Sequence, residues 1–111
     1  MKAFTDIEQS KKLAKILPIE SADMRYAPFG DTHPWVWDGN LLEKGAIPCW
    51  SLAALLNISP YIEVGRELYG AHHGKWYSRY TTGDYQYKTI ADNLIDACYE
   101  MILKLHEQKL I

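Results

Sequence analysis

Cysteine is scarce in this chain, and charge of neither sign predominates. The two cysteines, Cys49 and Cys98, are too few for the disulfide framework of a small secreted protein, so we expect a reducing, cytoplasmic location. The formal net charge of −2 disfavours nucleic acid and anionic membranes as partners, because both attract strongly basic surfaces. The amino-terminal residues also lack the apolar core of a signal peptide.

Patterns for membrane crossing and for ligand binding are missing as well. No hydrophobic run is long enough to cross a bilayer, so we expect no membrane partner. The glycines match neither a phosphate-binding loop nor a dinucleotide fingerprint, and no pair of carboxylates stands out from the acidic background. We therefore predict no cofactor, and the sequence favours a protein that is not an enzyme.

The composition is that of a folded globular protein. Hydrophobic residues make up 48% of the 111 residues, enough for one core, and we predict a single domain over residues 1–111. Aromatic residues make up 13%, mostly tyrosine and tryptophan, whose rings keep a polar tip and are favoured at interfaces. The sequence leaves open whether the protein is a monomer or a homodimer.

Residues 45–62 carry no charge, although charged residues are spread through the rest of the chain. Pro48 and Pro60 bracket a mostly apolar run, and proline suits the first turn of a helix because its missing N–H would be unpaired there. The pattern predicts a helix from Pro48 to about Asn57. A helix that is apolar nearly all round must be buried, either in the core or beneath a partner.

Two more helices are predicted from capping boxes. Thr5 and Glu8 fit such a box before a helix that ends near Leu17, where Pro18 disfavours helical geometry. Thr89 and Asp92 fit a second box, which opens a long amphipathic helix that reaches almost to the carboxyl terminus. Ser51 is an alternative cap for the central helix.

Alternating patterns predict strands between these helices. Short strands are expected near residues 22–26 and 35–37, and an antiparallel meander near residues 62–68, 75–81 and 85–88. Together the elements predict an α+β fold: a small antiparallel sheet of three to four strands, with about three helices packed on one face and a long C-terminal helix.

Cys49 is the candidate nucleophile. In the first turn of the predicted helix, backbone amides and the helix dipole would lower its thiol pKa, and His72 or His73 would serve as base in a small hydrolase or transferase. We favour the alternative that Cys49 is a small buried side chain next to Trp50. The adjacent histidines could also chelate a metal with Asp31, His33, Asp38 or Asp84, but neighbours in a strand point to opposite faces, so we predict no metal site.

The residues that we predict to bind a partner are aromatic or basic: Trp35, Trp37, Trp76, Tyr77, Arg79 and Tyr80. Strand alternation places Trp76 and Tyr80 on one face and Tyr77 and Arg79 on the other. A sheet face of aromatic rings flanked by cations can stack the bases of single-stranded nucleic acid. The negative net charge favours a protein partner instead, because Trp, Tyr and Arg dominate protein interfaces.

Three segments carry a family resemblance: residues 47–56 (Ile-Pro-Cys-Trp-Ser-Leu-Ala-Ala-Leu-Leu), Trp76 with Tyr77, and residues 89–97 (Thr-Ile-Ala-Asp-Asn-Leu-Ile-Asp-Ala). From about Ala46 onward, the chain resembles short uncharacterised proteins encoded by gut Bacteroidales and by the phages and mobile elements that infect them. That family has no assigned reaction, ligand or catalytic residues. The resemblance implies a small intracellular accessory protein, and with the aromatic residues it favours a non-enzymatic module that binds a protein or a second copy of itself.

Overall fold

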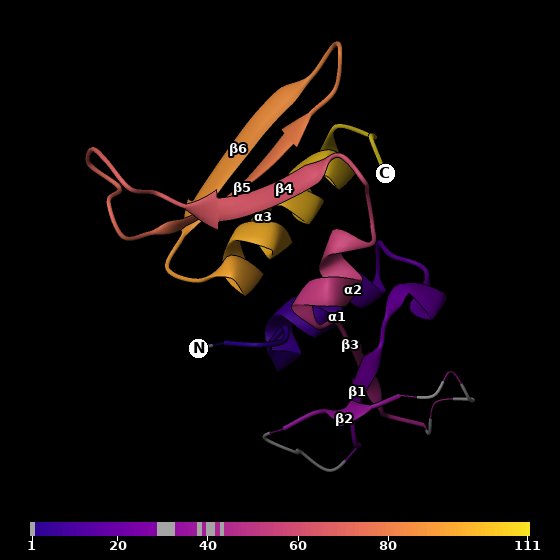
Figure 1. Cartoon of the computed structure of the whole chain (residues 1–111). Coiled ribbons are helices and arrows are strands. Elements are labelled where there is room, and N and C mark those ends of the chain that lie inside the picture. The colour runs from indigo at the N-terminus through magenta and orange to yellow at the C-terminus, as the bar shows by residue number, and fades with distance from the viewer. Residues whose placement is uncertain (1, 29–32, 38, 40–41, 43) are drawn as a thin grey trace.

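The structure of the protein is a computed structural model that describes residues 2–28, 33–37, 39, 42 and 44–111. These residues form three α-helices, one short 3-10 helix (Ile19–Ser21) and two antiparallel sheets of three strands each. The sheets lie at opposite ends of the molecule, with the helices between and beside them (Figure 1). The predicted α+β class and the long C-terminal helix are confirmed.

The first sheet is built from short strands that are far apart in the sequence. β1 (Met24–Tyr26) lies at its centre, between β2 (Trp35–Val36) and β3 (Ile47–Cys49). The amino-terminal segment extends this sheet, because Phe4 forms a bridge with Ser51 beyond β3. Helix α1 (Ile7–Ala14) follows this segment and packs against β3.

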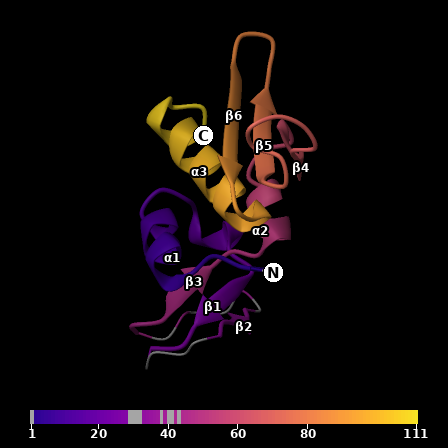
Figure 2. The same ribbon diagram turned by 90° about the vertical axis from the view of Figure 1, so that its left-hand side faces the viewer.

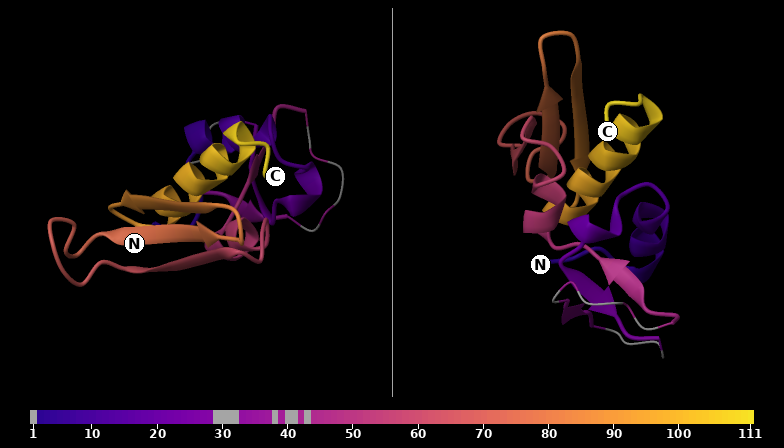
Figure 3. Two further views of the ribbon diagram at one scale, coloured as in Figure 1. Left: turned by 90° about the horizontal axis from the view of Figure 1, so that it is seen from above. Right: turned by 90° about the vertical axis from the view of Figure 1, so that its right-hand side faces the viewer.

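The second sheet is the predicted meander. β4 (Ile62–Arg66), β5 (Trp76–Thr81) and β6 (Gln86–Ala91) pair in sequence order, so β4 and β6 are its edges. Helix α3 (Leu94–Glu107) lies along one face of this sheet (Figure 3). The short helix α2 (Leu52–Leu56) packs against α3 and connects the two ends of the molecule.

One group of buried side chains joins the two ends. It combines residues of all three α-helices with Trp50 and residues near β1: Leu13, Leu17, Ala22, Trp50, Ala54, Leu55, Ile95, Cys98, Tyr99 and Ile102. We call this group the main core; in Figure 2, α2 lies where α1, α3 and both sheets approach one another. A smaller group, Ile62, Tyr80, Met101 and Leu105, lies between the second sheet and α3.

The prediction that Pro48 begins the central helix is wrong. Pro48 lies in β3, opposite Arg25, and α2 begins only after its cap, Ser51, whose side chain accepts a hydrogen bond from the Ala54 amide at 3.3 Å. The cause is long-range pairing: the Thr5 amide donates to the Trp50 carbonyl at 2.9 Å, which keeps this part of the chain extended. Pro48 can join the ladder because β3 lies at the boundary of the regular sheet.

Both predicted capping boxes are displaced toward the C-terminus. Helix α1 is capped by Asp6 with Gln9, and ends at Ala14 rather than near Leu17. Helix α3 is capped by Asn93, because β6 continues to Ala91 and holds Thr89 within the sheet. The predicted long helix is therefore correct in kind and begins about one turn later than expected.

Candidate functional site

A groove runs along the outer edge of the second sheet, between β6 and α3. Its first part has a volume of about 540 Å³ and is lined by Gln9, Lys75, Thr89, Ile90, Ala91, Asp92, Asp96 and Glu100. Its second part has a volume of about 340 Å³ and is lined by Lys88, Thr89, Glu100, Leu103, Lys104 and Glu107. Thr89 and Glu100 line both parts, so the two adjoin. We call the whole depression the β6–α3 groove.

The strand that borders this groove has an open edge. Residues of an antiparallel strand alternately bond to the neighbouring strand and turn their backbone groups away from it. The β5–β6 turn closes with a hydrogen bond from the Thr82 amide to the Tyr85 carbonyl at 2.9 Å, which sets this alternation. The N–H and C=O groups of Gln86, Lys88 and Ile90 therefore point away from β5, and no hydrogen bond among the described residues occupies them.

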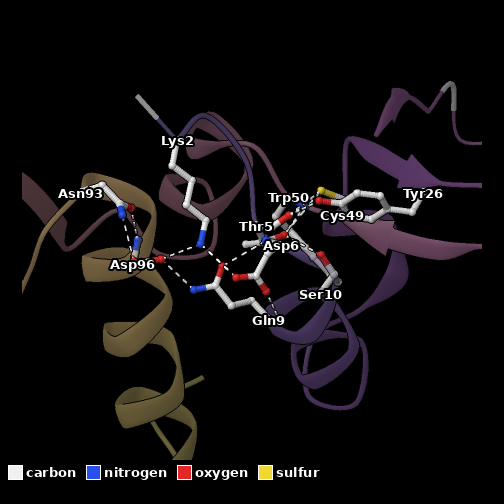
Figure 4. Close-up of polar contacts among 10 residues, drawn as sticks. All are labelled: Lys2, Thr5, Asp6, Gln9, Ser10, Tyr26, Cys49, Trp50, Asn93 and Asp96. Carbon is white, nitrogen blue, oxygen red and sulfur yellow. Dashed lines mark hydrogen bonds and ion pairs between the residues drawn. The ribbon is translucent and has the colours of Figure 1, made fainter. Parts of the chain in front are cut away.

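Asp96 closes the α1 end of the groove through a network of hydrogen bonds (Figure 4). Its carboxylate accepts from Lys2 Nζ and from Gln9 Nε2, each at 2.8 Å, and from Asn93 Nδ2 at 2.9 Å. Burial alone would raise the pKa of Asp96, but these three donors outweigh it and the pKa is lowered. Asp96 is therefore fully engaged in joining α1 to α3.

The remaining charges of the groove fall into two groups. Two of its lysines are in ion pairs, Lys75 with Asp92 at 3.2 Å and Lys88 with Glu67, whereas Nζ of the exposed Lys104 lies 5.2 Å from the centre of the Tyr87 ring. The exposed carboxylates of Glu100 and Glu107 form no ion pair within the described part of the chain. The groove therefore offers a ligand two carboxylates and one ammonium that are outside ion pairs, a balance of negative charge.

The predicted aromatic binding residues of the meander do not share a surface. Tyr80 is only 5% exposed and packs under α3 with Met101 and Leu105. Trp76 is half-buried on the same side of the sheet, with the Arg66 guanidinium 5.3 Å from its ring centre. The predicted alternation of the β5 side chains is correct.

Tyr77 and Arg79 lie on the opposite side of the sheet and are engaged there with neighbouring residues. The Tyr77 ring covers Gly65, where an added Cβ would lie 2.5 Å from the tyrosine hydroxyl. Arg79 lies over the same ring at 5.3 Å and pairs with Glu63 at 2.7 Å. Because carboxylates neutralise the cations, this face gives little support to stacking of nucleic-acid bases.

Trp35 and Trp37 lie in the other half of the molecule. Trp35, on β2, is 63% exposed, and its neighbour Val36 is exposed as well. Trp37 is half-buried and packs against the main core. The structure therefore separates these two residues from the other four predicted binding residues, and a binding role for Trp35 stays a prediction.

Cys49 lies in the interior, on β3 and not on a helix. It is fully buried against the Thr5 segment, and burial raises the pKa of its thiol, although hydrogen bonds from its neighbours act in the opposite direction. His72 and His73 are exposed in the loop between β4 and β5, which projects from the far end of the second sheet (Figure 1). The structure does not bring the proposed nucleophile and base together.

Within residues 2–28, 33–37, 39, 42 and 44–111, no three His, Cys, Asp or Glu side chains are placed to share a metal ion. No helix in these ranges is both long enough and apolar enough to cross a membrane. Asp31 and Asp38, named above as metal-ligand candidates, lie outside the described residues.

The β6–α3 groove was not predicted from the sequence. The signal that was available is the recurrence of Asp92, Asp96 and Glu100 at four-residue intervals, which places carboxylates on one side of a helix. The other wall, the edge of β6, depends on how the strands are ordered and has no local signature. Comparisons of the chain with protein-family models, with curated proteins and with solved structures yielded no match.

Proposed function

We propose that the protein is a non-enzymatic interaction module, and that an extended segment of a partner protein binds along the edge of β6. The observation that carries this proposal is the open edge of β6 beside the groove. Strand addition to such an edge gives affinity through main-chain hydrogen bonds, while pockets beside the edge select side chains. The outward-pointing groups of Gln86, Lys88 and Ile90 are the ones that a partner strand would bond.

The size of the groove supports this proposal. β6 has six residues, which at about 3.3 Å per residue offers an edge of about 20 Å. Every second side chain of an added strand would turn toward α3, into the groove of about 540 Å³ and its continuation of about 340 Å³. Volumes of this order are typical of ligand sites in proteins.

The biological setting is part of the same proposal. The sequence resemblance implies an accessory role in a phage or mobile element, and the two buried, unpaired thiols are in keeping with a cytoplasmic location. The partner in this proposal is a protein segment, supplied either by another protein or by a second copy of the chain.

The test is a selection of binders from a displayed library of random decapeptides, followed by two variants at one position. Lys88→Pro removes an outward N–H at the centre of the edge, where proline leaves the β5–β6 ladder intact. Lys88→Ala removes the side chain and keeps the N–H. We expect Lys88→Pro to weaken selected peptides at least about tenfold, since several edge hydrogen bonds depend on this register. Lys88→Ala should change affinity about twofold at most.

Two further measurements make the test decisive. Thermal unfolding shows whether Lys88→Pro is folded, and amide hydrogen exchange of the wild-type protein reports Gln86, Lys88 and Ile90 directly. Binding should slow exchange at these three amides and not at Tyr77, which lies inside the sheet. A library that yields no binder, or binders that leave these amides unprotected, would overturn the proposed function.

A further inference from the structure

We infer that the β6–α3 groove selects an extended segment that carries lysine or arginine on the side turned toward α3. This inference rests on the proposed strand addition at β6 and adds the chemistry of the partner. It is carried by two groove carboxylates that form no ion pair with another described residue, Glu100 and Glu107, beside an edge that can hold a strand.

Most cations of the groove are already held by carboxylates of the protein. Lys88 turns to Glu67 across the outer face of the sheet, and its ammonium also lies 4.9 Å from the centre of the Tyr77 ring. Lys104 lies over the Tyr87 ring, and Lys75 is paired with Asp92. An acidic segment would meet the two unpaired carboxylates and only the ammonium of Lys104 in return, so charge complementarity favours a basic segment.

The spacing of the two carboxylates suits an extended chain. Glu100 and Glu107 are separated by two turns of α3, about 10 Å along the helix axis at 1.5 Å per residue. Four residues of a strand span about 13 Å and bring side chains back to the same face. Long lysine or arginine side chains at positions four apart can therefore reach both carboxylates from one side of an added strand.

Asp96 and Asp92 play a different part. Asp96 is occupied by Lys2, Gln9 and Asn93, so it fixes the wall of the groove rather than binding the partner. Asp92 is exposed and already has Lys75 as its cation. The residues assigned to recognition of the basic side chains are thus Glu100 and Glu107 alone.

The experiment uses the random decapeptides selected on the full-length protein and reads out their composition. We expect enrichment of Lys and Arg, with two of them four positions apart. The double variant Glu100→Gln/Glu107→Gln should weaken the binding of these peptides about tenfold, because each exposed charge pair that is lost lowers the affinity about two- to fivefold. The matched control Glu8→Gln/Glu20→Gln removes the same charge from exposed positions outside the groove and should leave affinity unchanged.

Salt gives an independent measurement, because exposed charge pairs are screened at high ionic strength. Raising sodium chloride to about 1 M should weaken the wild-type complex and leave the double variant nearly unaffected. Selected peptides that are sensitive to Lys88→Pro but neutral or acidic would overturn the basic partner while leaving strand addition in place. Basic peptides that ignore Lys88→Pro would overturn strand addition itself.

Discussion

The backbone and side chain of Thr5 organise the interior of the first half of the protein (Figure 4). Its hydroxyl is hydrogen-bonded to the Ser10 hydroxyl at 2.8 Å and accepts from the Trp50 amide at 3.2 Å. Its carbonyl accepts from the Tyr26 hydroxyl at 2.7 Å and from the Cys49 thiol at 3.4 Å. The capping-box pattern predicted a helix cap at Thr5. That prediction was wrong because the partner of Thr5, Trp50, is distant in the sequence and no local pattern indicates it.

At this scale the structure predicts that Cys49 is unreactive. In the folded protein, iodoacetamide at neutral pH should alkylate Cys49 at least about 100-fold more slowly than in urea, because access requires an opening that costs about 3 kcal/mol or more. The raised pKa of the thiol slows the reaction further, since the thiolate is the nucleophile. Peptide mass mapping would measure the rate at each cysteine.

Cys98 serves as the internal control. It lies on α3 in the main core, and burial raises its thiol pKa to about 11, so it should be protected to a similar degree. If Cys49 is alkylated in the folded protein at the rate of the unfolded chain while Cys98 is not, the Cys49 thiol is accessible. That result would favour the hypothesis of a cysteine-dependent enzyme.

Long-range contacts determine where individual helices and strands begin and end. The motif Thr89 to Asp92 and the motif Asn93 to Asp96 are both good helix starts, and the local pattern does not choose between them. In the structure, α3 begins at the motif that starts with Asn93, because Ala91 still pairs with Trp76 in the sheet. Thr89 is instead held in place by the α3 backbone: its hydroxyl donates to the Ala97 carbonyl at 2.6 Å.

The network at Asp96 predicts a pH-dependent link between α1 and α3. Asp96→Asn should lower the free energy of unfolding by about 1 kcal/mol at pH 7, because a partly exposed carboxylate with charge-assisted partners is lost. The folded pKa of Asp96 lies below its ordinary value, so its stabilisation is fully present above about pH 4 and disappears as pH falls through the folded pKa. Urea unfolding from pH 7 to pH 2 would measure this difference.

Asp92→Asn is the matched control for this measurement. Among the described residues, the carboxylate of Asp92 makes only an exposed ion pair with Lys75, so its replacement should cost a few tenths of a kcal/mol at most. A gap between wild type and Asp96→Asn that stays constant down to pH 2 would show that the carboxylate charge is not what joins the helices.

At the scale of the whole molecule, the sequence predicted those elements whose residue pattern lies within one short stretch of chain. The meander and the C-terminal helix were read correctly because strand alternation and helical spacing are confined to short stretches of chain. The first sheet was predicted only in part: short strands were expected near residues 22–26 and 35–37, but the segment that forms β3 was expected to begin a helix at Pro48. The reason is that its pairing is long-range and brings Met24 opposite both Val36 and Cys49. The β6–α3 groove lies between two such elements and follows from their packing, which the sequence does not display.

Because the main core draws on all three α-helices, the two halves should unfold as one. Leu55 is fully buried in α2 at their junction, so Leu55→Ala should cost about 2–5 kcal/mol. Amide exchange should then accelerate together in β1 of the first sheet and β5 of the second. Leu68→Ala, at an exposed position in the β4–β5 loop, should change stability by less than about 0.5 kcal/mol. Loss of protection in one sheet alone would mean that the chain contains two independently stable units, each with its own core.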